Sequence, residues 1–287
     1  GRMSELAPGD VIVAALGRRH ATLEVTGSFE SVDESGRMHL LTSAGLVGVL
    51  TSKAPQLPPL VELRYRGHLI FRGRKRTMRE SAQSVTFGQF RTPTILLVGT
   101  SMAAGKTTAG KISVRRLKRA GLRVAGAKLT GAGRYRDILA YADAGADTIL
   151  DFVDVGLPST VVPADEYEEA LVDLLSLLAQ AEADVAVIEV GASPMEPYNG
   201  EAAIRALKEH VVATLLAASD PYAAFGVMEA FKIRPTLICG RATNTRAGIE
   251  LAEQLCEVQA LNLAEPSASD VLAQILLGSF SANDSVV

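Results

Sequence analysis

The sequence predicts a doubly wound, mostly parallel α/β P-loop sheet that follows a small all-β domain. From about residue 94 onward, short apolar runs alternate with helical patterns, which is typical of parallel sheets covered by helices. A glycine-rich turn follows the first of these runs. Before residue 90, short β-rich pieces are separated by turn signals, and helical periodicity is scarce. We therefore expect a β-rich domain over residues 4–90 and an α/β nucleotide-binding domain over residues 91–287.

Composition narrows the class of protein. The 287 residues are 48% hydrophobic, which is enough for one large or two moderate cores. A formal net charge of -3 gives no global attraction to nucleic acid or anionic membranes. No apolar run could span a bilayer, no signal peptide is recognisable, and Met3 is the expected natural start. Cys239 and Cys256 have no metal-site spacing and are expected to be free buried thiols, so we expect a cytoplasmic protein.

The N-terminal region has the pattern of a barrel or sandwich. Pro8-Gly9, Ser35-Gly36 and Pro58-Pro59 are among the signals that separate its strands. One hairpin is expected to turn near Gly67. Strands are predicted at residues 11–13, 21–29, 38–41, 46–50, 61–65, 68–71 and 85–87.

A basic run in this region has three interpretations. Its members are Arg64, Arg66, Arg72, Arg74, Lys75, Arg76 and Arg79, with Tyr65 and Phe71 interleaved. They could bind RNA, a polyphosphate or an acidic partner. They could instead form a solvated face, which the slightly acidic whole chain favours. As a third possibility, the basic loop could close over a ligand bound in the α/β domain.

The spacing of the histidines does not predict a metal site. His20, His39 and His68 lie in the N-terminal region and His210 lies in the second, with no acidic residue at a ligand-like offset. We expect them to be surface or hydrogen-bonded side chains.

In the second region strands and helices alternate. Strands or extended pieces are predicted at residues 95–98, 123–130, 148–153, 159–162, 185–190, 212–218, 236–239 and 258–263. Helices are predicted at residues 107–120, after 136, and at 166–181, 201–209, 223–231, 247–256 and 267–277. Ligands of such sheets bind at the carboxyl ends of the strands.

The turn after residue 98 has the layout of a phosphate-binding P-loop. Its backbone N–H groups and the helix N-terminus can hold phosphate oxygens. Lys106 can reach the outer phosphates, and the Thr107 hydroxyl can bind Mg²⁺. The predicted nucleotide-binding residues are Gly99, Thr100, Ser101, Met102, Ala103, Ala104, Gly105, Lys106, Thr107 and Thr108.

One departure from the usual pattern points to a family. Thr100 stands where the first glycine of G-x-x-x-x-G-K-[ST] is expected, and the glycine comes one place earlier. In this respect the loop resembles that of dethiobiotin synthetase, in the P-loop class that also holds the MinD-like ATPases. Ala103 and Ala104 differ from the acidic or branched residues usual there, and the early lysine of MinD-type loops is absent. Dethiobiotin synthetase has no β-rich first domain, so the resemblance implies a relative with another substrate.

The next strand ends with charged residues. A lysine inside an apolar strand is costly unless it reaches an anion. Lys128 matches a family lysine that faces the substrate and the γ-phosphate, and the resemblance implies the same role here. Asp137 matches an aspartate that helps to hold Mg²⁺, although helix N-capping is an equal alternative. Arg134 and Arg136 could bind a substrate carboxylate or the transferred phosphoryl group.

A glutamate ends another apolar strand. Glu189 needs a cation or a hydrogen-bond partner there. With the following Gly191-Ala192 it resembles the family's Glu-Gly-Ala turn, in which the glutamate coordinates Mg²⁺. The predicted metal ligands are therefore Thr107, Asp137 and Glu189. The polar loop after Ser193 offers Glu196, Tyr198 and Asn199 as substrate contacts.

Two further strand ends carry candidates. Asp220 is expected to cap a helix. The resemblance implies that Asn244 reads the purine edge of the nucleotide, with helix capping as its alternative role.

Together these residues predict a Mg²⁺-dependent enzyme that uses ATP. Lys106, Lys128, Arg134 and Arg136 are the catalytic candidates for phosphoryl transfer to a small acid or amine, as in a kinase or ATP-dependent ligase. One alternative is an acyltransferase whose P-loop holds the phosphates of coenzyme A. Another is a nucleotide-switched regulator or RNA-binding protein, although nucleic acid is the less expected partner. Related enzymes build sites at a two-fold interface, so a homodimer is expected.

Overall fold

The computed structural model describes residues 5–283, with side chains through residue 280. Outside the described residues lie residues 1–4 and 284–287. They include Met3, together with the first residue of the expected N-terminal domain and the last four residues of the expected second domain.

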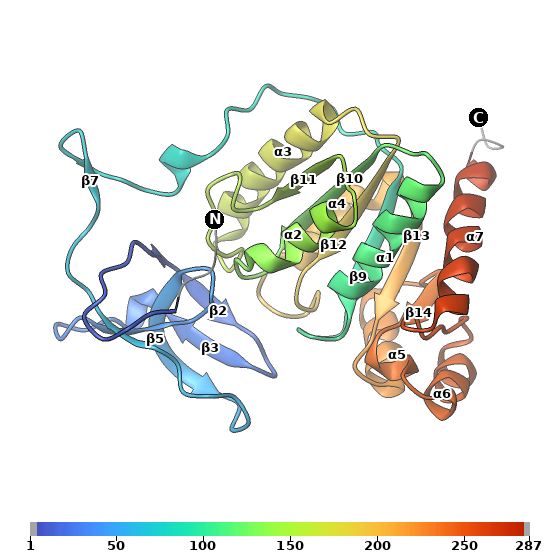
Figure 1. Cartoon of the computed structure of the whole chain (residues 1–287), viewed down its shortest axis with the longest axis horizontal. Helices are drawn as coiled ribbons and strands as arrows, with labels where there is room; N and C mark the ends of the chain where they lie inside the picture. The colour runs from blue at the N-terminus through green and yellow to red at the C-terminus, as the bar shows by residue number, and fades with distance from the viewer. Residues whose placement is uncertain (1–4, 284–287) are drawn as a thin grey trace.

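A six-stranded parallel sheet forms the centre of the larger part (Figure 1). Its strand order is β11-β10-β12-β9-β13-β14. Every residue of β9, β10 and β12 is buried, which explains why these strands are continuous apolar runs in the sequence. The strand bounds are β9 Thr94–Gly99, β10 Val124–Thr130, β11 Thr148–Asp151, β12 Val185–Val190, β13 Val211–Ala217 and β14 Leu237–Cys239.

Helices cover both faces of this sheet. One core contains side chains of α3, α4, α5 and α6, and the other contains side chains of α1, α2 and α7. The predicted doubly wound α/β class is therefore confirmed. The helix bounds are α1 Lys106–Arg119, α2 Tyr135–Asp143, α3 Ala164–Gln180, α4 Gly200–Leu207, α5 Pro221–Phe231, α6 Arg246–Cys256 and α7 Pro266–Asn283.

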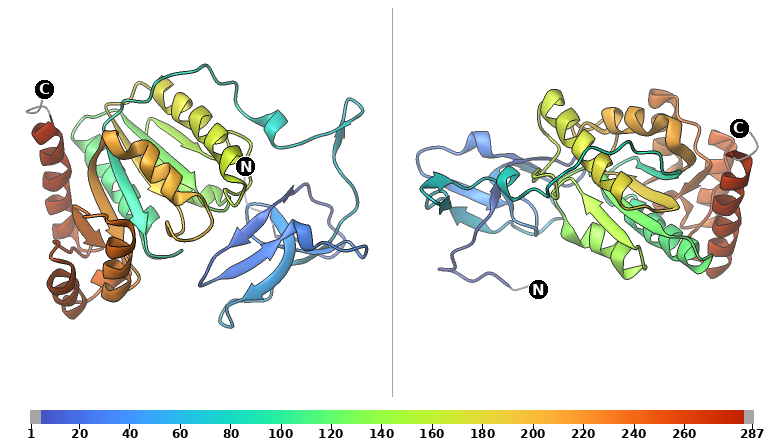
Figure 2. Two further views of the ribbon diagram at one scale, coloured as in Figure 1. Left: turned by 180° about the vertical axis from the view of Figure 1, so that it is seen from behind. Right: turned by 90° about the horizontal axis from the view of Figure 1, so that it is seen from above.

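The N-terminal part is a small, mostly antiparallel sheet. Its strand order is β2-β3-β5-β4-β6, and β1 pairs with β5 in parallel. A separate hairpin, β7–β8, projects away from both sheets (Figures 1 and 2). The bounds are β1 Ala15–Leu16, β2 Arg18–His20, β3 Val25–Ser28, β4 Arg37–Leu40, β5 Leu46–Lys53, β6 Glu62–Arg64, β7 Ile70–Phe71 and β8 Arg74–Lys75.

Some predicted strands are wrong. Residues 11–13 and 85–87 are not strands, and their apolar side chains Val11 and Phe87 stay 85% and 80% exposed because no sheet covers them. The hairpin does not turn near Gly67, since β6 pairs with β4 instead. The turn lies at Arg72-Gly73, where both residues have positive φ as a two-residue hairpin loop requires. Residues 258–263 contribute only a single bridge, from Ala260 to Ile238.

The N-terminal sheet lies beside the carboxyl ends of the parallel strands (Figure 1). The His20 N–H donates to Tyr198 Oη at 2.8 Å, and Arg18 donates to the Val161 carbonyl at 3.0 Å. A small apolar cluster joins Val25 and Leu41 to residues of the larger part. This sheet therefore lies against part of the edge at which ligands of parallel sheets bind, on the side of β10, β11 and β12.

Within the described part of the chain, no helix is both long and apolar enough to cross a bilayer. Cys239 and Cys256 are free and buried, as expected.

Candidate functional site

The predicted P-loop connects β9 to α1, as in a P-loop fold. The start of the loop is held by the neighbouring strand β13, because the Thr100 N–H donates to the Ala217 carbonyl at 3.1 Å. Gly105 has φ +118°, and a Cβ there would lie 2.9 Å from Gly240 Cα. Only glycine therefore fits at the residue before Lys106.

Lys106 points back into its own loop. Its ammonium is buried and donates to the carbonyls of Ser101 and Ala192, each at 2.8 Å. Burial lowers the pKa of Lys106, while the nearby charge of Glu189 opposes this shift. Hydrogen bonds from an ammonium to an anionic oxygen are stronger than those to neutral carbonyls, so this lysine fits the predicted phosphate contact.

Glu189 lies near the end of β12 and connects this strand to the first turn of α1. Its Oε2 accepts hydrogen bonds from Thr107 Oγ1 at 3.0 Å and from Tyr141 Oη at 3.3 Å. Glu189 as a residue is 3% exposed. A threonine hydroxyl and a buried carboxylate side by side are oxygen ligands of the kind Mg²⁺ prefers, so this pair fits the predicted metal.

Asp137 forms an ion pair with Lys128. Burial disfavours the Lys128 ammonium, but the charges of Glu189 and Asp137 together raise its pKa. The N-cap interpretation of Asp137 is wrong, because Arg134 occupies the N-cap position of α2 and Asp137 lies in the first turn. Asp137 therefore lies beside Lys128 and not beside Thr107, one of the residues with which it was predicted to bind the metal.

Arg134 and Arg136 lie at the start of α2 but face different surroundings. Arg134 Nη1 lies 4.0 Å from Glu24 Oε2 of the N-terminal part. Arg136 is exposed. The structure thus brings Arg134, and not Arg136, to the junction of the two sheets.

The loop after Ser193 is used for packing. Glu196 is buried and accepts hydrogen bonds from the backbone and hydroxyl of Thr22 at 2.8 and 2.7 Å. Tyr198 is fully buried. The amide of Asn199 donates to the carbonyls of Thr160 and Val162. These three predicted substrate contacts are occupied by contacts within the chain.

Asn244 lies in the loop that touches the P-loop. The Arg241 N–H donates to the Ala104 carbonyl at 3.2 Å. Asn244 itself is exposed, and Thr245 rather than Asn244 caps α6. Asp220 caps α5 as expected, by accepting from the Ala223 N–H. The capping alternative for Asn244 is therefore wrong, and its side chain faces solvent near the phosphate loop.

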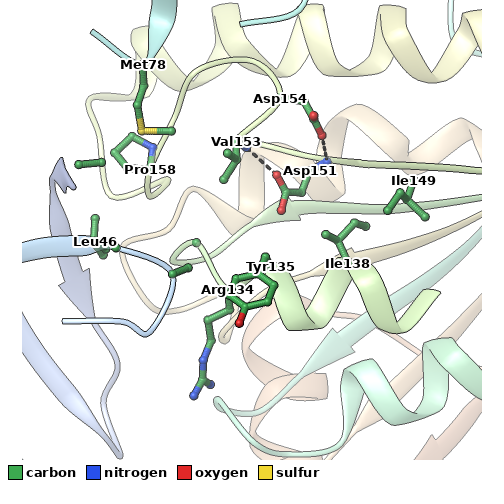
Figure 3. Close-up of a pocket in the computed structure, with 14 residues that line it drawn as sticks. Leu46, Met78, Arg134, Tyr135, Ile138, Ile149, Asp151, Val153, Asp154 and Pro158 are labelled. Atoms are coloured by element: carbon green, nitrogen blue, oxygen red, sulfur yellow. Dashed lines mark hydrogen bonds between the residues drawn. The ribbon is translucent and has the colours of Figure 1, made fainter. Parts of the chain in front are cut away.

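A cavity of about 340 Å³ lies between the two parts (Figure 3). Leu46 borders it from the N-terminal sheet, and Tyr135 and Ile138 border it from α2. Its walls are mostly apolar, but Arg134 and Asp151 also line it. Burial raises the pKa of Asp151 to about 6.

Sequence reasoning missed Tyr141, Asp151 and Arg19, which approach the site from α2, β11 and β2. A signal for Tyr141 exists in Gly110 and Gly126, where a Cβ would overlap the tyrosine side chain. Arg19 is buried beside Met102 of the P-loop. Nothing in its local sequence separates it from the exposed arginines of this region.

The basic run of the N-terminal part does not lie over the P-loop. Arg72 and Arg76 stack on Phe71 of the hairpin, and Arg79 pairs with Glu166 and Glu169 of α3. Among the described residues, no group of three or more His, Cys, Asp or Glu side chains could hold a metal. The three N-terminal histidines accordingly form no such group.

Comparisons with known proteins give similarities of structure only. No protein-family model matches the chain, and no curated protein matches it. The chain is similar to chloroplast FtsY from Physcomitrella patens, with 17% identity, a TM-score of 0.43, and coverage of 64% of this chain and 62% of that one. It is similar to the signal recognition particle 54 kDa protein from Aeropyrum pernix K1 in complex with GDP, with 19% identity, a TM-score of 0.41, and coverage of 67% and 48%.

A DUF1611 family protein from Anabaena variabilis is also similar, with 15% identity, a TM-score of 0.46, and coverage of 70% of this chain and 63% of that one. The chain spans less than two thirds of the length of each of these three proteins.

Proposed function

We propose that this protein is a Mg²⁺-dependent enzyme that binds ATP at its P-loop and transfers a phosphoryl group to a small acid or amine. The observation that carries the proposal is the 3.0 Å hydrogen bond between Thr107 and Glu189, directly beside the buried ammonium of Lys106. This arrangement supports the proposal because a lysine suited to phosphate and two oxygen groups suited to Mg²⁺ lie where the β9–loop–α1 unit meets the end of β12.

Each group has a distinct role in this proposal. Backbone N–H groups of the P-loop and the N-terminus of α1 hold the phosphates. The Lys106 ammonium leaves the carbonyls of Ser101 and Ala192 and contacts the β- and γ-phosphate oxygens. Thr107 and Glu189 would hold Mg²⁺, which when bound offsets negative charge on the phosphates.

Lys128 is the second cation of the proposed site. It stays protonated because Glu189 and Asp137 raise its pKa. Its charge favours an anionic group near the end of β10, the second strand from the sheet edge, in line with the resemblance to dethiobiotin synthetase. In the proposal it orients the transferred group and Arg134 orients the acceptor.

A thermal-shift panel tests this function. Wild type is compared with Lys106→Ala and with the control Lys111→Ala, which changes an exposed lysine on the same helix. The ligands are MgATP, MgGTP, ATP with EDTA, and acetyl-CoA. We expect a shift with MgATP that shrinks in EDTA, is absent in Lys106→Ala and is unchanged in Lys111→Ala.

Other results would change the proposal in defined ways. A shift with MgGTP alone would show that the nucleotide is GTP and not ATP, and the proposed binding site would stay the same. A shift with acetyl-CoA alone, insensitive to EDTA, would refute phosphoryl transfer and favour an acyltransferase.

A further inference from the structure

Arg19 is a buried arginine that the N-terminal sheet places against the phosphate loop. Its side chain is 6% exposed. One terminal nitrogen donates to the Leu41 carbonyl at 2.5 Å. The other pairs with Glu24 and lies 3.7 Å from Met102 Sδ. Met102 follows Ser101, whose carbonyl holds the Lys106 ammonium, so Arg19 borders the part of the loop at which that ammonium lies.

The guanidinium has an unused donor. Within the described chain, Arg19 Nε is the buried side-chain nitrogen or oxygen that has no hydrogen-bond partner. Buried donors of this kind are rare in folded proteins, because leaving one unpaired is unfavourable. The unpaired N–H, on a cation next to a phosphate-binding loop, points to an anionic acceptor.

The counter-ion of Arg19 is shared. Glu24 pairs with Arg19 and also lies 4.0 Å from Arg134 Nη1. If Arg19 turns toward another anion, Glu24 keeps Arg134 as a partner and does not become an isolated buried charge. Two guanidinium groups around one carboxylate leave a positive charge at this junction, which a phosphate oxygen would offset.

We propose that Arg19 is a further catalytic residue of the P-loop site, which donates hydrogen bonds to the terminal phosphoryl oxygens of a bound nucleoside triphosphate. This inference rests on the proposed function. During transfer, the bond between the γ-phosphorus and the β–γ bridging oxygen breaks, and its electron pair stays on the diphosphate. A new bond forms from the acceptor to the γ-phosphorus; an amine acceptor loses one proton to solvent, whereas a carboxylate acceptor is already deprotonated. Arg19 transfers no proton and stabilises the charge of the γ-oxygens.

A role in docking alone is the competing explanation, and Arg18 separates the two. Arg18 is the neighbouring residue on β2 and also joins the N-terminal sheet to the larger part, through the Val161 carbonyl. It pairs with Glu30 and does not touch the P-loop. If Arg19 only holds the sheet in place, substitutions of Arg18 and Arg19 should have similar effects.

The experiment compares Kd values of MgADP and a non-hydrolysable MgATP analogue, measured by calorimetry. Wild type, Arg19→Gln, Arg19→Lys, Arg18→Gln and Lys106→Ala are used. Wild type should bind the triphosphate more tightly than the diphosphate. Arg19→Gln should reduce this preference about tenfold or more while the Kd of MgADP changes less than about threefold. Arg19→Lys should restore part of the preference, and Arg18→Gln should keep all of it.

Two outcomes would overturn the inference. One is a wild type without preference for the triphosphate. The other is an Arg19→Gln protein with the wild-type preference. Either result leaves the proposed function intact if MgADP still binds wild type and fails to bind Lys106→Ala. Absence of all nucleotide binding by wild type would instead refute the proposed function itself.

Discussion

Thr107 Oγ1 donates a 3.0 Å hydrogen bond to Glu189 Oε2, which links the first turn of α1 to the end of β12. The two residues are far apart in the sequence, but β12 lies next to β9 in the sheet. The parallel topology therefore brings a hydroxyl and a carboxylate together beside the phosphate loop, and four predictions follow from this region and its surroundings.

Glu189→Gln should remove the Mg²⁺ dependence of nucleotide binding. Glutamine keeps an acceptor for Thr107 but has no charge with which to bind a divalent cation. We expect the apparent Mg²⁺ affinity to fall at least tenfold, while ATP binding in EDTA stays within about twofold. The measurement is the ATP-induced thermal shift as a function of MgCl2 concentration.

Tyr141→Phe is the matched control for that variant, because it removes only the 3.3 Å hydrogen bond to the same carboxylate oxygen. It should weaken Mg²⁺ binding less than Glu189→Gln does. Superimposable Mg²⁺ titrations of wild type and Glu189→Gln would rule out Glu189 as a metal ligand.

Gly110→Ala should destabilise the fold. A methyl group there would overlap the Tyr141 side chain, which is itself fully buried. We expect the free energy of unfolding to fall by about 1–3 kcal/mol, measured by urea denaturation. Gly226→Ala is the control, since that helical glycine has open space around its Cβ position and alanine should be neutral or stabilising by up to about 1 kcal/mol. Equal effects of both substitutions would contradict the packing argument.

Asp151 should make stability fall as the pH rises from about 4 to about 6. Burial raises the pKa of Asp151 to about 6, so the folded protein keeps a proton that the unfolded chain has already lost. The resulting loss is on the order of 3 kcal/mol or less above pH 6. Asp151→Asn should remove this slope in a series of melting temperatures between pH 4 and pH 8.

Asp147→Asn is the control of opposite sign. Hydrogen bonds from Lys118 and from the Val124 N–H lower the pKa of Asp147, so its stabilisation is lost as the pH falls below about 4. Asp147→Asn should therefore keep the Asp151 slope between pH 4 and pH 8 and lose stability differently from wild type only when the series is extended below pH 4. An unchanged slope in Asp151→Asn would show that another group causes it.

Glu196→Gln should loosen the N-terminal sheet. The carboxylate accepts two hydrogen bonds from Thr22 and one from the Ser193 N–H. The glutamine side chain would place its NH2 group against one of these N–H or O–H donors, and that hydrogen bond would be lost. We expect the free energy of unfolding to fall by about 1–3 kcal/mol and amide hydrogen exchange to become faster over residues 18–28. Glu201→Gln, at an exposed position in α4, should leave the exchange unchanged. Protection equal to wild type in Glu196→Gln would show that this contact does not hold the sheet.

The larger part could be predicted from sequence because its signals are local. The buried strands are unbroken apolar runs, and the residues Gly105-Lys106-Thr107 stand between one such strand and a helix. A strand end also shows where a polar side chain will lie, and this allowed Glu189 and Lys128 to be chosen.

The errors occur where pairing depends on distant residues. The predicted hairpin at Gly67 is wrong because β6 pairs with the distant β4, which leaves β7 to pair locally across Arg72-Gly73. Arg19 and Glu196 became part of the junction through contacts between segments far apart in the sequence, and no periodicity reports such contacts. Phe87 shows the converse, since an apolar residue without a partner surface stays exposed.

The close approach of Gly105 and Gly240 limits how this protein can change its ligand preference. A side chain at position 240 would overlap the Ala104 carbonyl, and the neighbouring Arg241 N–H is bonded to that same oxygen. The loop that carries Asn244 is thus locked to the loop that surrounds Lys106, and the two must move as one body. Variation in selectivity is therefore open to exposed positions such as Asn244, whereas substitution of either glycine would also disturb the proposed phosphate site.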